Sequence, residues 1–324
     1  MADTPLRVVA FGGGTGLPVL LRGLREPVGD GLTAVVTVAD DGGSSGRLRQ
    51  ELGIAPPGDV RRCLVALAGR RNLADVFEYR FESGAELHDH SVGNLFIAAL
   101  ADMSGGFSEG VERAGRFLRI KGAVLPAADE SLTLVVHHPD GSVTRGESSL
   151  REHTGSVERV SVEPEGAVAP PGVPAAIEAA DIVVLSPGSL YTSTLPALLG
   201  GGTAEALAAF AGPVVYAANL MTQPGETLGF SVADHLQAIR SHVGPVVTDV
   251  LVNSVPLPAP LAARYREDGA ASLAVDCDEI ERLGVRLHSA PLLDETALGQ
   301  TARHDPQRLA ERLLTLAPAV APSR

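Results

Sequence analysis

The sequence predicts an α/β fold: a Rossmann-like three-layer α/β/α sandwich with a mostly parallel sheet and a small β-rich insertion. Residues 6–11 and 32–39 form short apolar runs, which are typical of strands buried on both faces of a parallel sheet. A glycine-rich turn and a helical pattern over residues 17–24 separate the two runs, and this order makes a βαβ unit. Open α/β sheets bind ligands beyond the carboxyl ends of their strands, so we expect the functional residues in the loops there.

Further helices are expected in the first half of the chain. Residues 56–68 place turn residues before an apolar spacing, which predicts a helix with Asp59 as a candidate cap. A buried helix is predicted to begin near Asn94, and the amphipathic stretch 107–118 continues this helical region.

The texture of the sequence changes between about residues 124 and 163, where the segments alternate and become more polar. Residues 131–138 and 142–146 flank a Pro-Asp-Gly turn and predict a β-hairpin, while residues 157–162 predict a third strand. We therefore expect a single α/β domain over residues 1–324 that carries a β-rich insertion at about 124–163.

The buried-strand pattern resumes in the second half, at residues 181–185, 213–218 and 246–252. A polar loop follows each run, including the loop from Ser186 to Ser193 and the loop that begins at Asn219. Because the carboxyl ends of parallel strands share one edge of the sheet, these loops are expected to meet the first glycine-rich loop.

Composition excludes several classes of protein. The chain has 324 residues, 45% of them hydrophobic, so it can form a sizeable core. Its formal charge of −13 argues against a general affinity for nucleic acid, which needs clustered Lys and Arg. The chain has two cysteines, no apolar leader and no run of about 18 apolar residues. We therefore expect a cytoplasmic protein without disulfides and without membrane insertion.

The first glycine-rich loop has the sequence Gly12-Gly13-Gly14-Thr15-Gly16 and follows the first strand. Glycines let the backbone approach an anion closely, and the start of the next helix supplies N–H donors. Gly12 and Gly14 fit the first two positions of the dinucleotide fingerprint G-x-G-x-x-G, but the third position is Leu17. The candidate nucleotide-binding residues of this loop are Gly13, Gly14, Thr15 and Gly16.

The second glycine-rich loop follows the second strand and begins with Asp40 and Asp41. These carboxylates either cap backbone N–H groups of the turn or contact a ribose or a divalent metal, so they are the candidate metal ligands. Ser44 and Ser45 come next, and their hydroxyls can donate to a phosphate, cap the following helix or do both. All four side chains are candidate ligand contacts.

The loop from Ser186 to Ser193 is a second candidate anion site. Its hydroxyls, together with the Gly188 N–H and the start of the following helix, can surround an anion without any lysine. The alternative is an ordinary capped turn between a strand and a helix. Tyr191 either stacks on a base or packs. The candidates are Ser186, Gly188, Ser189, Tyr191, Thr192 and Ser193.

Other polar side chains give weaker signals. Arg61 and Arg62 stand near a predicted helix start, where their guanidinium groups either clamp phosphate oxygens or face solvent. Asn94 and Asn219 each offer a donor and an acceptor to a base or a sugar. Both asparagines are candidate nucleotide-binding residues.

Two pairs of histidines are expected to be structural or solvated. His88 and His90 alternate, as metal ligands on a strand would, but no third ligand is evident near them in the sequence. His137 and His138 fall in the predicted hairpin. Neither pair supplies a catalytic triad, so the sequence indicates no acid, base or nucleophile set.

Six motifs, in the same order, resemble those of the YvcK family, also called the gluconeogenesis factors. They are Phe11-Gly-Gly-Gly-Thr-Gly-Leu, Thr37-Val-Ala-Asp-Asp-Gly-Gly-Ser-Ser-Gly-Arg-Leu-Arg, Pro56-Pro-Gly-Asp-Val-Arg, His90-Ser-Val-Gly-Asn-Leu, Pro187-Gly-Ser-Leu-Tyr-Thr-Ser and Asn219-Leu-Met-Thr-Gln-Pro-Gly-Glu-Thr. The resemblance spans nearly the whole chain. It departs at Pro18, after the first loop, and at Arg62, where the family pattern is expected to have asparagine.

The resemblance carries its own expectations. The family is related to the CofD transferases, which implies a nucleotide in the strand-end cleft of a Rossmann-like fold. Its members are associated with UDP-sugars such as UDP-N-acetylglucosamine, and with the regulation of cell-wall synthesis and morphology during growth on gluconeogenic carbon. No firm enzymatic reaction is implied. By similarity, the cleft is lined by Gly13 to Gly16, Asp40, Asp41, Asn94, Ser186 to Ser193 and Asn219.

We therefore expect a nucleotide-sugar sensor that a cell-wall enzyme or its regulator reads, and that forms a homo-oligomer. Two alternatives stay open. The first is a CofD-like transferase in which Asp40 and Asp41 hold a divalent metal against a nucleotide-activated donor. The second is a nicotinamide-dependent oxidoreductase, motivated by the near-fingerprint at Gly12. Beyond a UDP-sugar ligand and a divalent metal, no cofactor is expected.

Overall fold

A seven-stranded parallel sheet forms the centre of the computed structural model, which describes residues 5–152, 156–296 and 301–318. The order of the strands is β10-β9-β8-β7-β1-β2-β3, and every neighbouring pair is parallel. The strands are β1 (Val8–Gly12), β2 (Leu32–Val36), β3 (Ala123–Pro126), β7 (Ile182–Leu185), β8 (Val214–Ala217), β9 (Asp249–Asn253) and β10 (Arg286–Ala290). The predicted α/β fold with a parallel sheet is confirmed.

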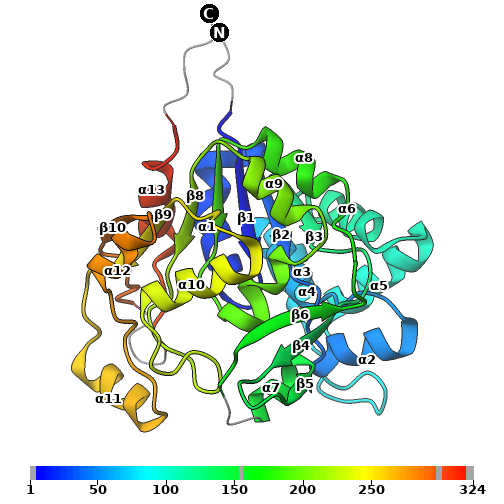
Figure 1. The fold of residues 1–324 in the computed structure, drawn as a ribbon. Helices are drawn as coiled ribbons and strands as arrows, with labels where there is room; N and C mark the ends of the chain where they lie inside the picture. Colours follow the sequence, from blue (N-terminus) through cyan, green and yellow to red (C-terminus); the bar gives the residue numbers. More distant parts are fainter. Residues whose placement is uncertain (1–4, 153–155, 297–300, 319–324) are drawn as a thin grey trace, which may run out of the picture.

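The direction in which the chain adds strands reverses between β1 and β7. From β1 the chain continues to β2 and β3 on one side of the sheet, whereas β7, β8, β9 and β10 follow one another on the other side. Figure 1 shows β1 in the middle of this arrangement. In open α/β sheets, the crevice beyond the carboxyl ends of two such strands is where ligands bind.

Helices cover both faces of the sheet. On one face α1 packs on β1 and β2, with α3 and α13 beside it. On the other face α8, α9 and α10 lie in front of the strands in Figure 1. The helices are α1 (Gly16–Val28), α2 (Gly43–Leu52), α3 (Gly58–Leu67), α4 (Arg71–Glu78), α5 (Val92–Ser104), α6 (Phe107–Leu118), α7 (Glu147–Glu152), α8 (Gly172–Ala179), α9 (Thr203–Ala209), α10 (Val232–Val243), α11 (Ala259–Glu267), α12 (Cys277–Arg282) and α13 (Pro306–Leu314), with the short turns η1 (Gly29–Gly31), η2 (Leu190–Thr194) and η3 (Pro196–Leu198).

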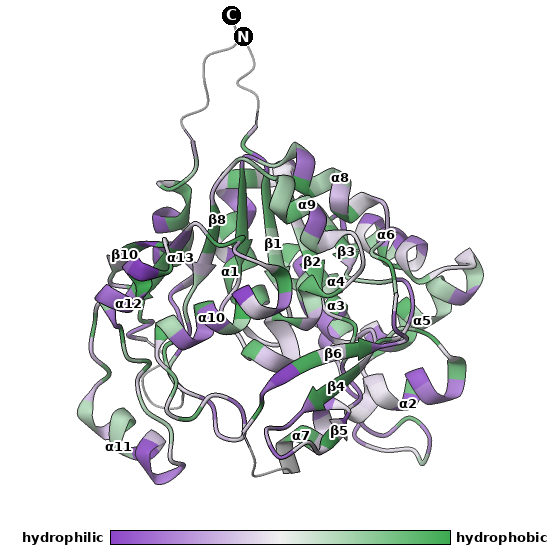
Figure 2. Cartoon of the chain, in the orientation of Figure 1, coloured by the Kyte–Doolittle hydropathy of each residue, from purple (hydrophilic) through white to green (hydrophobic). Residues whose placement is uncertain are grey.

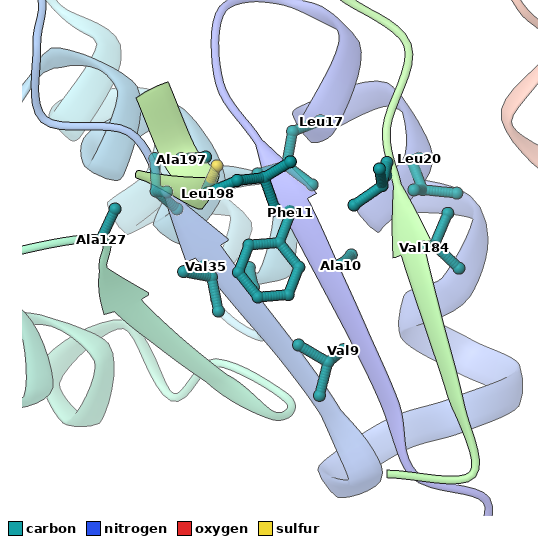
Figure 3. Packing of buried hydrophobic residues seen from close by; sticks show 14 of the residues in the cluster. Val9, Ala10, Phe11, Leu17, Leu20, Val35, Ala127, Val184, Ala197 and Leu198 are labelled. Carbon is teal, nitrogen blue, oxygen red and sulfur yellow. The ribbon is translucent and has the colours of Figure 1, made fainter. Parts of the chain in front are cut away.

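The core forms because the central strands are apolar along both faces, as two layers of helices require. Every residue of β1 and β7 is buried. Figure 3 shows Phe11 of β1 beside Ala197 and Leu198 of η3, with Leu20 of α1 packed on the same sheet. In Figure 2 the hydrophobic colour is concentrated on the strands, and the polar colour on the outer helices. None of the helices in the described ranges is long and apolar enough to cross a membrane.

A small antiparallel sheet lies beyond the carboxyl ends of β1 and β2 (Figure 1). Its order is β5-β4-β6, with β4 (Thr133–His137), β5 (Val143–Arg145) and β6 (Arg159–Glu163). The predicted hairpin and third strand are confirmed. The predicted insertion, by contrast, begins too early at residue 124, because β3 pairs with β2 in the main sheet. As an edge strand, β3 alternates between half-buried and buried residues, a pattern that resembles an antiparallel strand.

Two details of the predicted helices differ from the structure. Helix α5 begins at Val92, before Asn94, because the Ser91 side chain accepts the Asn94 N–H and caps the helix. The prediction that Asp59 caps α3 is wrong: Pro57 precedes that helix, and Asp59 lies inside its first turn. The Asp59 carboxylate instead reaches out of the helix to the first glycine-rich loop.

Candidate functional site

The loops that leave β1 and β7 touch each other at the crevice. A side chain on Gly16 would overlap the Pro187 carbonyl, and one on Gly12 would overlap the Ser186 hydroxyl. Glycine is therefore required at both positions by the neighbouring loop. Gly14, with a φ of +58°, adopts the left-handed conformation that glycine tolerates. The two sequence motifs thus form one continuous structure.

A buried carboxylate fixes the first glycine-rich loop. Asp59 is 4% exposed, and its Oδ2 accepts the Gly14 N–H at 2.6 Å. Its Oδ1 pairs with Arg62, one turn further along α3. Arg62 also donates from Nε to the Gly14 carbonyl at 3.1 Å. Both backbone groups of Gly14 are therefore held by the protein, and Gly14 shapes the loop.

Asn219 joins the loops that follow β7 and β8. Its Oδ1 accepts the Gly188 N–H at 2.8 Å, and its Nδ2 donates to the Gly188 carbonyl at 2.6 Å. This two-point contact fixes the backbone at Gly188, the third residue of the loop from Ser186 to Ser193.

The hydroxyl of Ser189 has a complete set of partners inside the protein. It donates to Glu226 and accepts from the N–H and the Oγ1 of Thr192, at 3.1 and 2.7 Å. A hydroxyl has one hydrogen and two acceptor lone pairs, so all are used. Ser189 acts as the cap of η2, which is the alternative that the sequence left open.

Tyr191 packs into an aromatic group behind the loop. It is 2% exposed and makes edge-to-face contacts with Phe230 and His242, each with ring centroids 6.4 Å apart. Burial and the nearby charge of Glu226 raise the pKa of Tyr191 to about 12. Of the two interpretations of Tyr191, this geometry favours packing.

A cavity of about 450 Å³ opens beside these loops, within the usual range of roughly 300–1,000 Å³ for small-molecule sites. Its walls come from the first half of α1, the loops after β7 and β8, and residues 302–304 before α13. The polar lining comprises Thr15, Arg22, Arg62, Glu78, Ser189, Asn219, Thr222, Gln223, Tyr265, Asp268, Arg303 and His304.

Three arginines face the cavity from three different elements. Arg22 lies on α1, Arg62 on α3, and Arg303 precedes α13. Their guanidinium groups stand against the carboxylates of Glu78 and Asp268, the acidic groups among the described lining residues. Arg62 is already paired with Asp59, so three guanidinium groups stand against three carboxylates, in a chain of net charge −13. The cavity is therefore less acidic than the chain as a whole, and its arginines can bind an anionic ligand.

His304 contributes an uncharged polar wall. It is 6% exposed, and burial lowers its pKa to about 4, although a hydrogen bond with the Ala218 backbone opposes this shift. Its Nε2 has no hydrogen-bond partner within the described part of the chain. The nitrogen is fully buried, so His304 shapes the wall as an uncharged ring.

The aspartate pair after β2 lies outside the lining of this cavity. The Oδ1 of Asp41 accepts the N–H and the hydroxyl of Ser148, at 3.0 and 2.8 Å, and so caps the start of α7. The Oδ1 of Asp40 accepts the Gly42 N–H at 2.9 Å, and burial raises the pKa of Asp40. Residues 5–152, 156–296 and 301–318 contain no group of three or more His, Cys, Asp or Glu side chains arranged to hold a metal ion.

Ser44 and Asn94 belong to a second buried polar cluster, whereas Ser45 hydrogen-bonds with Asp40. Asn94 Nδ2 donates to the Ser44 hydroxyl, which lies 3.0 Å from His90 Nδ1. Ser44 and Ser45 are each 4% exposed, and Asn94 is 1% exposed. His90 therefore bonds with Ser44, as expected of a hydrogen-bonding histidine, and the cluster is separate from the cavity.

Comparison with known proteins gives the family. A family model described as 2-phospho-L-lactate transferase CofD matches residues 8–293. The chain belongs to the CofD family. Sequence identity with relatives supports the resemblance seen in the motifs. The chain is 44% identical to a gluconeogenesis factor of Halalkalibacterium halodurans, over 95% of each chain. It is 41% identical to the gluconeogenesis factor of Bacillus subtilis, over 96% of this chain and 98% of that protein.

A solved member of the family has the same fold. The crystal structure of a UPF0052-family protein from Bacillus halodurans superposes with a TM-score of 0.92 at 43% identity. The match covers 97% of this chain and all of the solved chain. The parallel sheet, the small antiparallel sheet and the crevice between β1 and β7 therefore belong to a fold with an experimental counterpart.

The structure divides the predicted site residues into two groups. Those that line the cavity are Thr15, Gly16, Gly188, Ser189 and Asn219. Those outside its lining are Gly13, Gly14, Asp40, Asp41, Ser44, Ser45, Asn94, Ser186, Tyr191, Thr192 and Ser193. Several other polar lining residues were not predicted as site residues from the sequence, namely Arg22, Glu78, Tyr265, Asp268, Arg303 and His304. They lie in helices or loops that carry no glycine motif, and only the folded chain brings them to the crevice. Their signal in the sequence is limited to single charged or aromatic residues.

Proposed function

We propose that this chain is a cytoplasmic nucleotide-sugar-binding regulatory protein. Its ligand is UDP-N-acetylglucosamine or a related UDP-sugar, and its role lies in cell-wall synthesis, cell morphology and growth on gluconeogenic carbon. The names of its relatives, which are gluconeogenesis factors, support the metabolic part of this proposal. The single observation that carries the binding part is the cavity lined by three arginines at the point where the strand order reverses.

The diphosphate is proposed to lie at the start of α1. The first N–H groups of a helix have no partner within the helix, and the helix dipole favours an anion there. Thr15 and Gly16 supply such groups at the cavity wall, whereas Pro18 has no N–H. Arg62 lies at the same wall, and a guanidinium can bind phosphate oxygens with two parallel hydrogen bonds.

The rest of the cavity suits the nucleoside and the sugar. Thr222 and Gln223 offer hydroxyl and amide groups, and Tyr265 offers an aromatic face. Asp268 can accept from sugar hydroxyls. Ser189 carries a hydroxyl of the type that acts as a nucleophile, but all of its hydrogen-bonding capacity is taken up inside the protein. This favours binding over chemistry, with the protein surface around the occupied loops read by a cell-wall enzyme or its regulator.

Calorimetric titration with UDP-N-acetylglucosamine tests the proposal. We expect saturable binding to the wild type and at least about tenfold weaker binding to Arg22→Ala, which removes one cation from the cavity. Arg25→Ala is the matched control, because it makes the same charge change on the same helix while Arg25 contacts Ala68 and Glu26 away from the cavity. No heat of binding with the wild type, or equal losses in both variants, would contradict the proposal.

A CofD-like transferase is the second candidate, and the description of the matching family model favours it. In this version Asp40 and Asp41 hold a divalent metal that neutralises the diphosphate of an activated donor. Asp40 has the charge of Asp59 nearby, which helps to raise its pKa and would favour a cation beside the pair. Magnesium-dependent consumption of a nucleotide-activated donor supports this candidate, and an intact nucleotide across candidate acceptors counts against it.

A further inference from the structure

Arg61 is a buried cation without a carboxylate partner. The side chain is 4% exposed, yet no ion pair within 4.0 Å involves it in the described part of the chain. Its one hydrogen bond runs from Nε to the Asn94 Oδ1, at 3.1 Å, and leaves the two terminal nitrogens of the guanidinium unpartnered. These two nitrogens are not fully buried, so an anion from solution can reach them. A largely buried charge without an ionic partner is costly, and such an anion would offset that cost.

The absence of a side chain at Gly93 leaves space for Arg61. Gly93, in the first turn of α5, lies against Arg61, and a Cβ there would approach the Arg61 Cδ to 2.8 Å and the Phe77 carbonyl oxygen to 2.7 Å. Any other residue at position 93 would displace Arg61 or the backbone of α4. The guanidinium is therefore held at the amino end of α5, a helix of 13 residues.

The surroundings of Arg61 hold arginines as well as carboxylates, and none of these carboxylates forms an ion pair with it in the described part of the chain. Burial is the largest cause that lowers the pKa of Arg61 to about 10, and the charges of Arg62 and Arg80 lower it further. The charges of Glu78 and Asp59 raise it by less. Burial is also the largest cause of the lowered pKa of the neighbouring His90; Arg47 and Arg80 lower it further, while Glu51 raises it. The positive end of the α5 dipole adds to this field. The arginines and the helix end favour an anion from outside the protein, while Glu78, Asp59 and Glu51 oppose it.

We propose that Arg61, the amino end of α5 and Arg80 form an anion subsite that takes the phosphate group of a small second ligand. A phosphate offers several oxygens and up to two negative charges, which matches a guanidinium fork flanked by a second arginine better than a single carboxylate does. Arg61 is not among the lining residues of the cavity, and Arg62 next to it is. The subsite is thus separate from the proposed nucleotide position but joined to it through one turn of α3.

Thermal unfolding with added inorganic phosphate or glycerol 3-phosphate, at matched ionic strength in a phosphate-free buffer, tests this subsite. We expect both the wild type and Arg22→Ala to show a saturable rise in Tm with at least one of the two probes. A rise with phosphate alone assigns a free ion, and a larger rise with the monoester assigns a phosphorylated metabolite. No rise in the wild type, or a rise that Arg22→Ala abolishes, overturns the proposal, because the latter places the anion in the cavity.

Two variants keep the test independent of misfolding. Arg61→Lys retains the charge but not the planar fork, and we expect the midpoint concentration of the effective probe to rise about tenfold. Asn94→Asp is isosteric and supplies an internal carboxylate to Arg61. It should therefore raise Tm without any probe and lose the further rise with phosphate. An unchanged phosphate response in both variants would show that the anion binds elsewhere.

Discussion

Replacement of Gly16 by alanine separates two opposite expectations about the first glycine-rich loop. Gly16 is the first residue of α1, and alanine is the better helix former by up to about 1 kcal/mol. On local propensity alone, Gly16→Ala would stabilise the protein. The structure predicts the reverse, because the position faces the backbone of the loop after β7.

The size of the effect follows from what the new methyl group would meet. It would lie 2.5 Å from the carbonyl carbon of Pro187 and 3.2 Å from the nitrogen of Gly188, and still closer to the Pro187 oxygen. These are backbone atoms, which cannot rotate away, so the cost belongs in the upper part of the usual 1–3 kcal/mol for overpacking, roughly 2–3 kcal/mol. After the gain in propensity, we expect Gly16→Ala to lower the free energy of unfolding by about 1–2 kcal/mol.

Urea unfolding measures this change, provided that the slope with denaturant stays constant. Gly172→Ala is the matched control: Gly172 is also the first residue of a helix, α8, and a Cβ there would make ordinary contacts of 3.4 and 3.6 Å with Leu125. It should be neutral or stabilising. Gly110→Ala, which would crowd the backbone of Ala101 in α5 far from the cavity, should cost stability without loss of UDP-sugar affinity. A Gly16→Ala variant as stable as Gly172→Ala would refute the reasoning.

Three further predictions concern charge. Asp40→Asn should stabilise the ligand-free protein at pH 7, because burial raises the pKa of Asp40 above its unfolded value and disfavours the ionised form in the fold. The gain in stability should vanish as the pH falls below the unfolded pKa, where Asp40 is protonated in both states. Urea midpoints at pH 7 and below the unfolded pKa check it. Burial lowers the pKa of His235 and of His304 to about 4, so the free energy of unfolding should fall by roughly 3 kcal/mol for each as pH falls from 6.5 to 4. His304→Gln should remove about half of that acid sensitivity, and an unchanged pH profile would contradict the assignment. Arg22→Ala should leave the ligand-free Tm within about 2 °C of the wild type, because Arg22 is exposed and makes no ion pair in the described residues; a larger fall would indicate a structural role.

The sequence predicts those parts of the molecule that local patterns encode. Continuous apolar runs identify β1 and β7 because a strand covered on both faces buries every side chain and has no solvent-facing side. Strand β10, by contrast, was not predicted, since its residues Arg286–Ala290 are polar and half-buried at the edge of the sheet. Edge strands carry little periodic signal, and their place is decided by the partner strand.

The meeting of the strand-end loops was predictable from the sequence, but their contacts were not. The loops after β1 and β7 were expected to meet, and Gly16 does lie against Pro187. Asp59 illustrates the limit: next to a helix start it resembles a cap, yet its carboxylate holds Gly14, which is 45 residues away. Asn219 was likewise predicted from the sequence to bind a ligand through its amide, whereas in the fold the amide makes two hydrogen bonds with the Gly188 backbone. Long-range polar pairs of this kind depend on tertiary geometry that no local pattern records.

A crystal structure of the chain with UDP-N-acetylglucosamine tests the central claim most directly. The account predicts a diphosphate at the start of α1, within hydrogen-bond distance of the Gly16 N–H and of Arg62, with the nucleoside and sugar in the cavity toward Tyr265 and Arg303. An empty cavity at saturating ligand, or a nucleotide whose diphosphate lies over Asp40, would contradict it.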